Sequence, residues 1–496
     1  MTFKDGAAGP DKLAKTGFWL GIGVGLLFIL AAPFLPRPPE LSVGALRLVG
    51  VTAWVGIWWI TEAIPLGATA LLPAAIFPLL GITSTKEVAP AYASPFVLLL
   101  LGGFLLALAV ERSGVHRRIA LHVLLAVGTS PRRLVLGFAL AAASLSMWIS
   151  NTATTLIMLP IALAIADRAS RSAHGFGVAL LLAVAYGASV GGMATPVGTP
   201  PNLIAMSALE ARFPEGPTLN FVEWSFRALP AVVLIIPILW LALTRVYPRV
   251  PISLDLGAGP VIRREITALG AWRPSEVRAL AVFGVAAILW VTRPDIRVGD
   301  AWTIPGWAGA LGVKGASDAT VALLAAVLAF SLPAGDESAK PGERLLPWET
   351  AMKAPWGLVL LFGGGVALAK GFEKTGLSAY LGEALAQLVG AGLIPFISLS
   401  ALAATFGTEI ISNTALANIT MPILAATAEV AAIDARSLLV PVAMACSCAF
   451  MMPAATGPNA IVFGTGKVRI QEMVRAGFLI NLLAWAVIVV VTISLA

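Results

Sequence analysis

The chain has 496 residues, of which 58% are hydrophobic and 12% charged, and its mean hydropathy is +0.90. These values exclude a soluble globular domain, because apolar runs of about 20 residues, enough to cross a roughly 30 Å hydrocarbon core, recur along the chain. The formal charge of +7 does not indicate nucleic-acid binding, since Lys and Arg lie in short connections beside apolar segments, where they report membrane topology.

About eleven apolar segments are predicted to span the membrane as helices. In chain order they lie near residues 17–35, 42–61, 64–82, 95–111, 178–208, 227–245, 277–292, 317–332, 356–371, 436–465 and 474–495. Two further apolar segments, 134–166 and 392–428, are each interrupted by a polar tripeptide. We predict that they are re-entrant helical hairpins, which a membrane tolerates only where protein or a cavity satisfies the exposed backbone. The expected fold class is an all-α polytopic membrane protein.

The distribution of basic residues predicts which side of the membrane each connection faces. The N-terminus and the basic stretches 112–118, 132–133, 168–171 and 245–278 fall on one side, which is therefore the cytoplasm. We expect a multi-pass protein of the cell inner (plasma) membrane with a cytoplasmic N-terminus. The first hairpin then enters the membrane from inside and the second from outside, as an inverted-topology repeat requires.

Direct comparison of the two halves shows a repeat. At an offset of 262 residues the tripeptide 150–152, Ser-Asn-Thr, matches 412–414. The same offset relates a glycine pair, a glutamate and a further glycine: Gly102, Gly103, Glu111 and Gly114 match Gly364, Gly365, Glu373 and Gly376. The segments 198–202 and 455–459, with Thr-Pro-Pro-Asn and Thr-Gly-Pro-Asn, match at an offset of 257.

The repeat divides the chain into four parts. We predict an N-terminal segment with the first transmembrane helix (1–39), a first inverted repeat (40–250), a cytoplasmic linker (251–276) and a second inverted repeat (277–496). Each repeat holds one hairpin tip and one helix broken by Pro and Gly.

Hydroxyls and carboxamides are costly in a low-dielectric setting, so their duplication at the tips and breaks favours a binding site. Four half-helix N-termini, each roughly +0.5 of a charge, offset about two negative charges, which suits a dianion. Freed carbonyls and Asn oxygens are hard ligands for a monovalent cation. The segments 138–166, 186–207, 404–424 and 445–463 contain no Lys, Arg or His, so bound sodium has to help neutralise the anion.

The sequence gives little support for proton coupling, metal binding or catalysis. A proton-coupled carrier needs a buried carboxylate, for which Glu409 and Glu62 are the candidates, although a capping or interhelical hydrogen bond is the favoured interpretation of each. All three histidines lie in or near predicted cytoplasmic loops, where we expect solvated side chains. Cys446 and Cys448 lack the further ligands of a metal site and are expected to pack. An enzyme is not expected, because no catalytic constellation is present.

The paired Ser-Asn-Thr tips, the two segments 198–202 and 455–459, and the stretch Trp58–Pro65 (WWITEAIP) resemble the divalent anion/sodium symporter family of INDY-type dicarboxylate transporters. The resemblance covers nearly the whole chain. It implies a homodimer, surrounded by membrane lipid, that carries small C4-dicarboxylate anions of the succinate, malate and fumarate type together with sodium by an elevator mechanism. A sodium-independent dicarboxylate exchanger and a carrier of sulfate or another oxyanion with the same fold are the alternatives.

The resemblance also implies which residues bind each ligand. The first sodium ion would be held by Ser146, Ser150, Asn151 and the Gly198 carbonyl, and the second by Thr408, Ile411, Asn413 and Ala455. The substrate carboxylates would meet Asn151, Thr152, Thr199 and Pro200 from one half, and Ser412, Asn413, Thr414 and Thr456 from the other. Gly457 stands where the family's common pattern has proline, so restoring proline is expected to change anion preference more than sodium dependence.

Overall fold

The first half of the chain folds into helices that begin at capping residues. They are α1 (Pro10–Ala31), α2 (Val43–Thr61), α3 (Leu66–Thr69), α4 (Leu72–Leu80), α5 (Thr85–Val88), the 3-10 turn η1 (Ala89–Ala93), α6 (Pro95–Ser113), α7 (Val115–Val127), α8 (Pro131–Ser146), α9 (Asn151–Ala166), α10 (His174–Gly192), α11 (Pro200–Arg212), α12 (Phe221–Leu241) and the π-helical turn η3 (Ala242–Val246). The side chains of Ser42, Ser94 and Asn220 accept backbone N–H groups at the starts of α2, α6 and α12.

The second half is also helical. Its elements are α13 (Ala258–Leu269), α14 (Pro274–Thr292), β1 (Ile296–Val298), β2 (Trp302–Ile304), α15 (Trp307–Ala310), α16 (Asp318–Ser331), α17 (Trp348–Ala351), α18 (Trp356–Lys374), α19 (Leu377–Gly390), α20 (Leu393–Gly407), α21 (Asn413–Val430), α22 (Ala435–Ala445), α23 (Gly457–Gly464) and α24 (Ile470–Ser494). The antiparallel pair β1 and β2, with Ile296 opposite Ile304, is the one sheet among the described residues.

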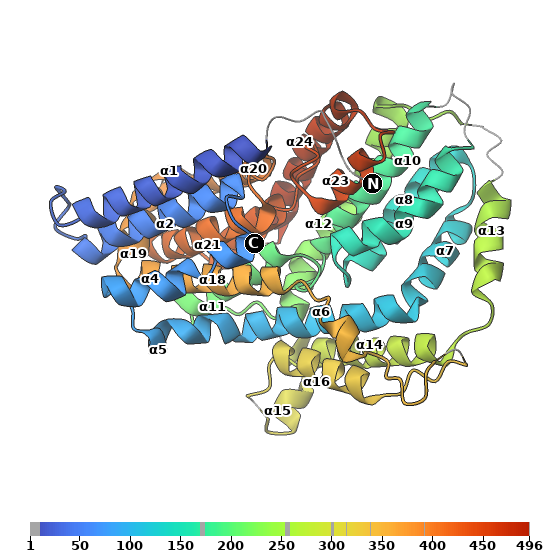
Figure 1. Ribbon diagram of the computed structural model, residues 1–496, viewed down its shortest axis with the longest axis horizontal. Helices are drawn as coiled ribbons and strands as arrows, with labels where there is room; N and C mark the ends of the chain where they lie inside the picture. Colours follow the sequence, from blue (N-terminus) through green and yellow to red (C-terminus); the bar gives the residue numbers. More distant parts are fainter. Residues whose placement is uncertain are drawn as a thin grey trace.

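The computed structural model describes residues 10–168, 174–252, 258–298, 302–313, 315–337, 339–390 and 392–495, so most of the basic stretch 168–171 lies outside the described residues. The molecule is elongated, with the paired helices α1 and α2 at one end and α7 and α13 at the other (Figure 1). Helices α14, α15 and α16 form a group along one long side. The predicted all-α architecture is confirmed.

Eight helices of the described residues are long and apolar enough to cross a membrane. Some of the predicted spans are built from shorter pieces, because proline or glycine interrupts them. The segment 64–82 is divided into α3 and α4, 178–208 breaks between α10 and α11, and 436–465 breaks between α22 and α23. The predicted span at 317–332 is the 14-residue helix α16.

The helices repeat with the spacing that the sequence indicates. Helices α7, α8 and α9 begin 262 residues before α19, α20 and α21. The turns that precede α7 and α19 use Gly114 and Gly376, with φ of 82° and 77°, a left-handed conformation that glycine adopts without strain. Helix α9 packs against α23, and α21 packs against α11. This exchange of partners between the halves is what an approximate two-fold axis requires.

Three helices of more than ten residues among the described residues were not predicted from the sequence. Helices α7 and α19 connect α6 to α8 and α18 to α20, and they are too short to be recognised as spans. Helix α13 occupies much of the predicted linker 251–276 and packs against α7. Two charged side chains of this region are buried as an ion pair, Arg118 on α7 with Glu276 on α14 at 2.9 Å. His116 on α7 is buried as well, so the expectation of a solvated side chain was wrong for this histidine.

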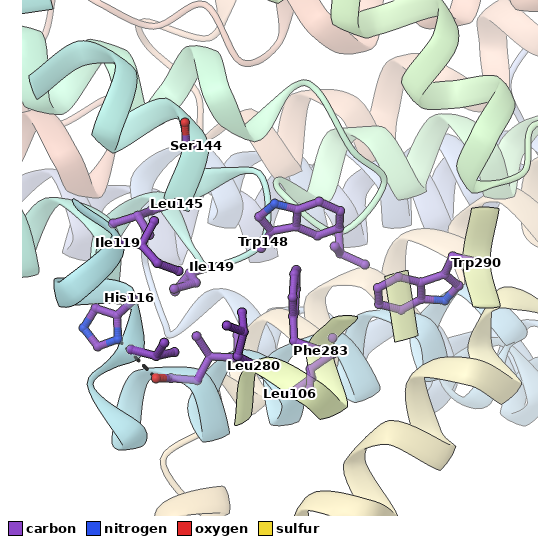
Figure 2. A pocket seen from close by; sticks show the side chains of 15 residues that line it. Leu106, His116, Ile119, Ser144, Leu145, Trp148, Ile149, Leu280, Phe283 and Trp290 are labelled. Atoms are coloured by element: carbon purple, nitrogen blue, oxygen red, sulfur yellow. Dashed lines mark hydrogen bonds between the residues drawn. The ribbon is translucent and has the colours of Figure 1, made fainter. Parts of the chain in front are cut away.

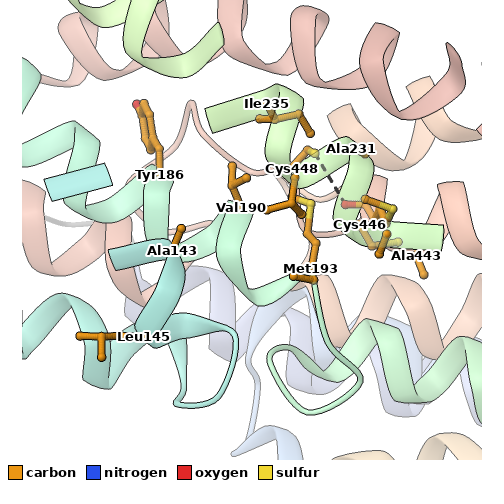
Figure 3. Packing of buried hydrophobic residues seen from close by; sticks show 14 of the residues in the cluster. Ala143, Leu145, Tyr186, Val190, Met193, Ala231, Ile235, Ala443, Cys446 and Cys448 are labelled. Atoms are coloured by element: carbon orange, nitrogen blue, oxygen red, sulfur yellow. Dashed lines mark hydrogen bonds between the residues drawn. The ribbon is translucent and has the colours of Figure 1, made fainter. Parts of the chain in front are cut away.

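The centre of the core is helix α10, which is surrounded on nearly all sides. Figure 3 shows Cys446 and Cys448 in this layer, near Val190 and Met193. Both cysteines are free and fully buried, and the Cys448 Sγ donates to the Met444 carbonyl at 3.6 Å. Their predicted role in packing is confirmed.

Candidate functional site

The first hairpin tip lies between the end of α8 and the start of α9. Ser150 caps α9 by accepting the Ala153 N–H at 3.2 Å. The hydroxyl of Ser146, which is fully buried, donates to Asn151 Oδ1 at 2.5 Å. Asn151 is half-buried, whereas Thr152 is exposed. The tip therefore fixes one carboxamide oxygen and leaves one hydroxyl accessible.

The second hairpin tip repeats this construction between α20 and α21. Ser412 caps α21 by accepting the Ala415 N–H at 3.3 Å. The Thr408 hydroxyl faces both Asn413 Oδ1, at 2.6 Å, and the Cys446 carbonyl, at 2.7 Å. The pair of a hydroxyl and an Asn carboxamide thus occurs twice, at positions that the 262-residue offset relates.

One asparagine side chain stabilises the break in each of the two broken helices. In the first, the Asn202 Nδ2 donates to the Gly192 and Thr195 carbonyls at 3.0 and 2.7 Å. In the second, the Asn459 Nδ2 donates to the Ala449 and Met452 carbonyls at 2.9 and 3.0 Å. The two asparagines and their acceptors are related by the 257-residue offset. Each carboxamide thus satisfies carbonyls that the interrupted helix cannot pair.

Each tip is also fastened to the broken helix of its own half. In the first half, the Thr195 hydroxyl donates to the Met147 carbonyl. In the second half, the Glu409 carboxylate accepts the backbone N–H groups of residues 450, 451 and 452 at 2.7, 2.8 and 2.9 Å. Met147 and Glu409 are repeat counterparts, as are Thr195 and Met452. In the first half a side chain of the break donates to a backbone carbonyl of the tip, and in the second half backbone N–H groups of the break donate to a side chain of the tip.

Glu409 therefore makes structural hydrogen bonds to the second break and caps no helix, and it is buried at 8% exposure. Its fourth donor is the Asn481 carboxamide at 2.7 Å. No Lys, Arg or His among the described residues forms an ion pair with Glu409. The other candidate, Glu62, is the exposed C-cap of α2. A buried carboxylate that only neutral groups satisfy increases the need for a cation nearby.

The first predicted sodium ligands lie together. A Cβ added at Gly192 would be 2.6 Å from Asn151 Oδ1 and 3.1 Å from the Gly198 carbonyl oxygen. Both oxygens are therefore close to one point at the end of α10. They join the buried Ser146 hydroxyl, which contacts the same Asn151 oxygen.

The structure does not bring the other predicted ligand residues as close together as those of the first sodium ion. Thr199 and Thr456 are the N-caps of α11 and α23, and Pro200 is the first residue of α11. Among the described residues, no hydrogen bond connects these to the second tip, where Thr414 is buried. Two predicted ligands of the second sodium, Ile411 and Ala455, are half-buried, and neither has a polar side chain, so only their carbonyls can bind an ion.

The first tip contacts the second half of the chain at Gly457. A Cβ added at Gly457, the first residue of α23, would lie 2.3 Å from Thr152 Oγ1. The first tip therefore touches the start of the second broken helix, beside its N-cap Thr456.

An apolar cavity of about 250 Å³ lies behind the first tip (Figure 2). Trp148 of the tip reaches into it and meets Phe283 of α14 edge to face, with ring centroids 4.8 Å apart. Its lining is almost wholly hydrocarbon, with His116 and Ser144 as the polar exceptions. Burial lowers the pKa of the His116 imidazole, which favours its neutral form. The lining of this cavity lacks the hydrogen-bond donors that a dianion needs.

Sequence reasoning missed several residues that shape the site. Asn202 and Asn459 were recognised within their motifs, but their structural role was not assigned. The signal was available, because both asparagines recur at the 257-residue offset. Gly192 and Thr195 carried no such signal, since their counterparts Ala449 and Met452 differ from them in side chain.

A fold of two related halves with re-entrant tips and broken helices defines a secondary membrane transporter rather than an enzyme. The model of one family, described as the sodium:sulfate symporter transmembrane region, matches residues 18–495. The chain belongs to this family, and the expected kinship with divalent anion/sodium symporters is confirmed.

Two curated relatives resemble the chain over almost its full length. The sodium-dependent dicarboxylate transporter SdcS of Staphylococcus saprophyticus is 37% identical over 490 residues, which cover 97% of this chain and 92% of the relative. The protein of the same name from Staphylococcus aureus is 36% identical over 490 residues, 97% of this chain and 91% of its own length.

Solved structures share the fold at low identity. The YdaH transporter of Alcanivorax borkumensis matches with a TM-score of 0.53 and 16% identity, over 97% of both chains. MtrF of Neisseria gonorrhoeae matches with a TM-score of 0.60 and 13% identity, over 96% of this chain and 94% of MtrF. These matches show the fold alone.

Proposed function

We propose that this chain is a symporter that couples sodium to the transport of C4-dicarboxylates of the succinate, malate and fumarate type. The observation that carries the proposal is the duplicated pair of a hydroxyl and an Asn carboxamide, Ser146 with Asn151 and Thr408 with Asn413. Each pair offers oxygens to a hard monovalent cation at a helix start that also favours an anion. The names of the two staphylococcal relatives support the same ligands.

Charge explains why the two ligands would bind together. A dianion at the tips meets helix N-termini but no cationic side chain, and the Glu409 carboxylate adds a further negative charge nearby. Sodium held by Ser146, Ser150, Asn151 and Gly198, and by Thr408, Ile411, Asn413 and Ala455, would offset these charges. The carboxylates would then contact the remaining tip and break residues, from Thr152 and Thr199 in one half to Thr414 and Thr456 in the other.

We further propose that the hairpins and broken helices move as one body in an elevator cycle. Helices α8 to α12 and α20 to α24 pack on one another, and α6, α14 and α16 pack mainly with one another. Helix α18 packs with the N-terminal helices α3 and α4 and also contacts α11 and α21 of the first group. The short helices α7 and α19 connect these two groups at equivalent points. Among the described residues, the lining of the apolar cavity behind Trp148 is almost wholly hydrocarbon, so movement of the first tip along it costs little free energy in broken hydrogen bonds. We expect a homodimer embedded in lipid.

The inverted topology makes a sharp prediction at two exposed repeat counterparts, Glu111 and Glu373. Single cysteines there, on a background without Cys446 and Cys448, should react with an impermeant thiol reagent from opposite sides of the membrane. Glu111→Cys is expected to react from the cytoplasm, because it adjoins the basic stretch 112–118, and Glu373→Cys from outside. Labelling of both from the same side would contradict the inverted repeat, and labelling of Glu111→Cys from outside would contradict a cytoplasmic N-terminus.

Uptake into proteoliposomes tests the proposed coupling. We expect an inward sodium gradient to drive succinate accumulation at a rate roughly tenfold above that with choline in place of sodium, as a coupling of typical size gives. Two other outcomes select the alternatives. Equal uptake with choline, requiring dicarboxylate inside the vesicles, would indicate exchange. Sodium-driven sulfate uptake without succinate uptake would indicate an oxyanion carrier, which the family's description favours as the second candidate.

A further inference from the structure

The two broken helices differ at one position that the repeat makes equivalent. After the capping threonines Thr199 and Thr456, α11 begins with Pro200 and α23 begins with Gly457. The absence of a side chain at Gly457 makes room for Thr152. A Cβ at position 457 would lie 2.3 Å from Thr152 Oγ1, 3.3 Å from its Cβ and 3.4 Å from its Cγ2. A side chain at position 457 would therefore clash mainly with the Thr152 hydroxyl.

The two sides of this contact are both fixed. Thr152 follows Asn151, which is held by Ser146 at 2.5 Å, and the tip is fastened through the Met147 carbonyl. Helix α23 is held by Asn459, which donates to two carbonyls of the break at 2.9 and 3.0 Å. A side chain at position 457 therefore cannot push the helices apart freely, and the Thr152 side chain must rotate away.

We propose that Gly457 is a positioning residue for the substrate, because its lack of a side chain leaves room for the Thr152 hydroxyl against the start of α23, next to Thr456 in the chain. The inference rests on the proposed function, in which these hydroxyls bind a carboxylate of a short dicarboxylate. Rotation of Thr152 removes one hydrogen bond to a charged group. The first sodium site is spared, because its oxygens on Asn151 and Gly198 face Gly192 instead.

A double-mutant cycle tests the contact. Thermal stabilisation by succinate in saturating sodium, and by sodium alone, is measured for wild type, Gly457→Ala, Thr152→Ala and the double variant. We expect each single variant to weaken succinate binding roughly 10- to 100-fold, as loss of a hydrogen bond to a charged group does. The double variant should be no weaker than either single one, because without Oγ1 the nearest atom is the Thr152 Cβ at 3.3 Å. Sodium stabilisation should not change.

Gly464→Ala on the same helix is the matched control, since nothing lies within 4 Å of its Cβ position. If Gly457→Ala fails to fold, Thr152→Ala carries the test, because it adds no atom. Additive losses, wild-type succinate binding by either single variant, or an equal loss of sodium binding would each overturn the inference. Wild type that sodium stabilises but no dicarboxylate does would instead overturn the proposed substrate, and the inference with it.

Discussion

Asn151→Ala and Asn413→Ala should each abolish sodium-driven uptake, with a loss of about 100-fold or more. Each carboxamide oxygen is held by a neighbouring hydroxyl, at 2.5 Å from Ser146 Oγ and 2.6 Å from Thr408 Oγ1. In our proposal each Asn serves both an ion and a carboxylate, so its removal loses two charge-assisted interactions at once. Uptake of labelled succinate into proteoliposomes with purified variants measures the effect.

Asn220→Ala is the matched control for these two variants. This asparagine also accepts backbone N–H groups at a helix start, at 3.0 Å from Val222 and Glu223, but it caps α12 and is not a proposed ligand. We expect a lower melting temperature and retained sodium dependence. Uptake near the wild-type rate by either tip variant would show that the ligands bind elsewhere.

Gly192→Ala should weaken sodium binding roughly 10- to 100-fold while the protein still folds. The backbone at Gly192 has no positive φ, so alanine is not strained there. Its Cβ would nevertheless lie 2.6 Å from Asn151 Oδ1 and 3.1 Å from the Gly198 carbonyl oxygen. Crowding of this kind costs about 1–3 kcal/mol in a packed core, and here it moves the oxygens that we propose as ligands. The sodium concentration that half-stabilises the protein against heat measures the shift.

Gly284→Ala provides the control for this substitution, because a Cβ at position 284 on α14 meets nothing within 4 Å. It should leave sodium binding unchanged. The counterpart of Gly192 in the second half is Ala449, which already carries a Cβ. An unchanged sodium requirement in Gly192→Ala would place the first sodium away from Asn151 and Gly198.

Much of this fold could be predicted from apolar length and from the repeat. The breaks at 193–199 and 446–456 follow from Pro and Gly in long apolar runs, and the tips follow from polar residues between two such runs. Helices α7 and α19 could not be predicted in the same way. They are short and amphipathic, so neither their length nor their mean hydropathy separates them from a loop.

The candidate site was predictable where chemistry is duplicated and unpredictable where only packing decides. The pairs at Asn151 and Asn413 are visible in the sequence, because both occur within Ser-Asn-Thr. The contact between Gly457 and Thr152 depends on how the halves approach each other across about 300 residues of chain, which no local pattern encodes. The bonds of Glu409 to the second break are of the same kind, since its counterpart Met147 carries no carboxylate.

We propose that sodium and a dicarboxylate bind at one shared site. Calorimetric titration of succinate into the purified protein, in sodium and then in potassium at the same ionic strength, tests this proposal. We expect succinate to bind at least about tenfold more tightly in sodium, and sodium affinity to rise by the same factor when succinate is present, because linkage is reciprocal. Equal succinate affinity in sodium and potassium would contradict the symport account and favour sodium-independent exchange.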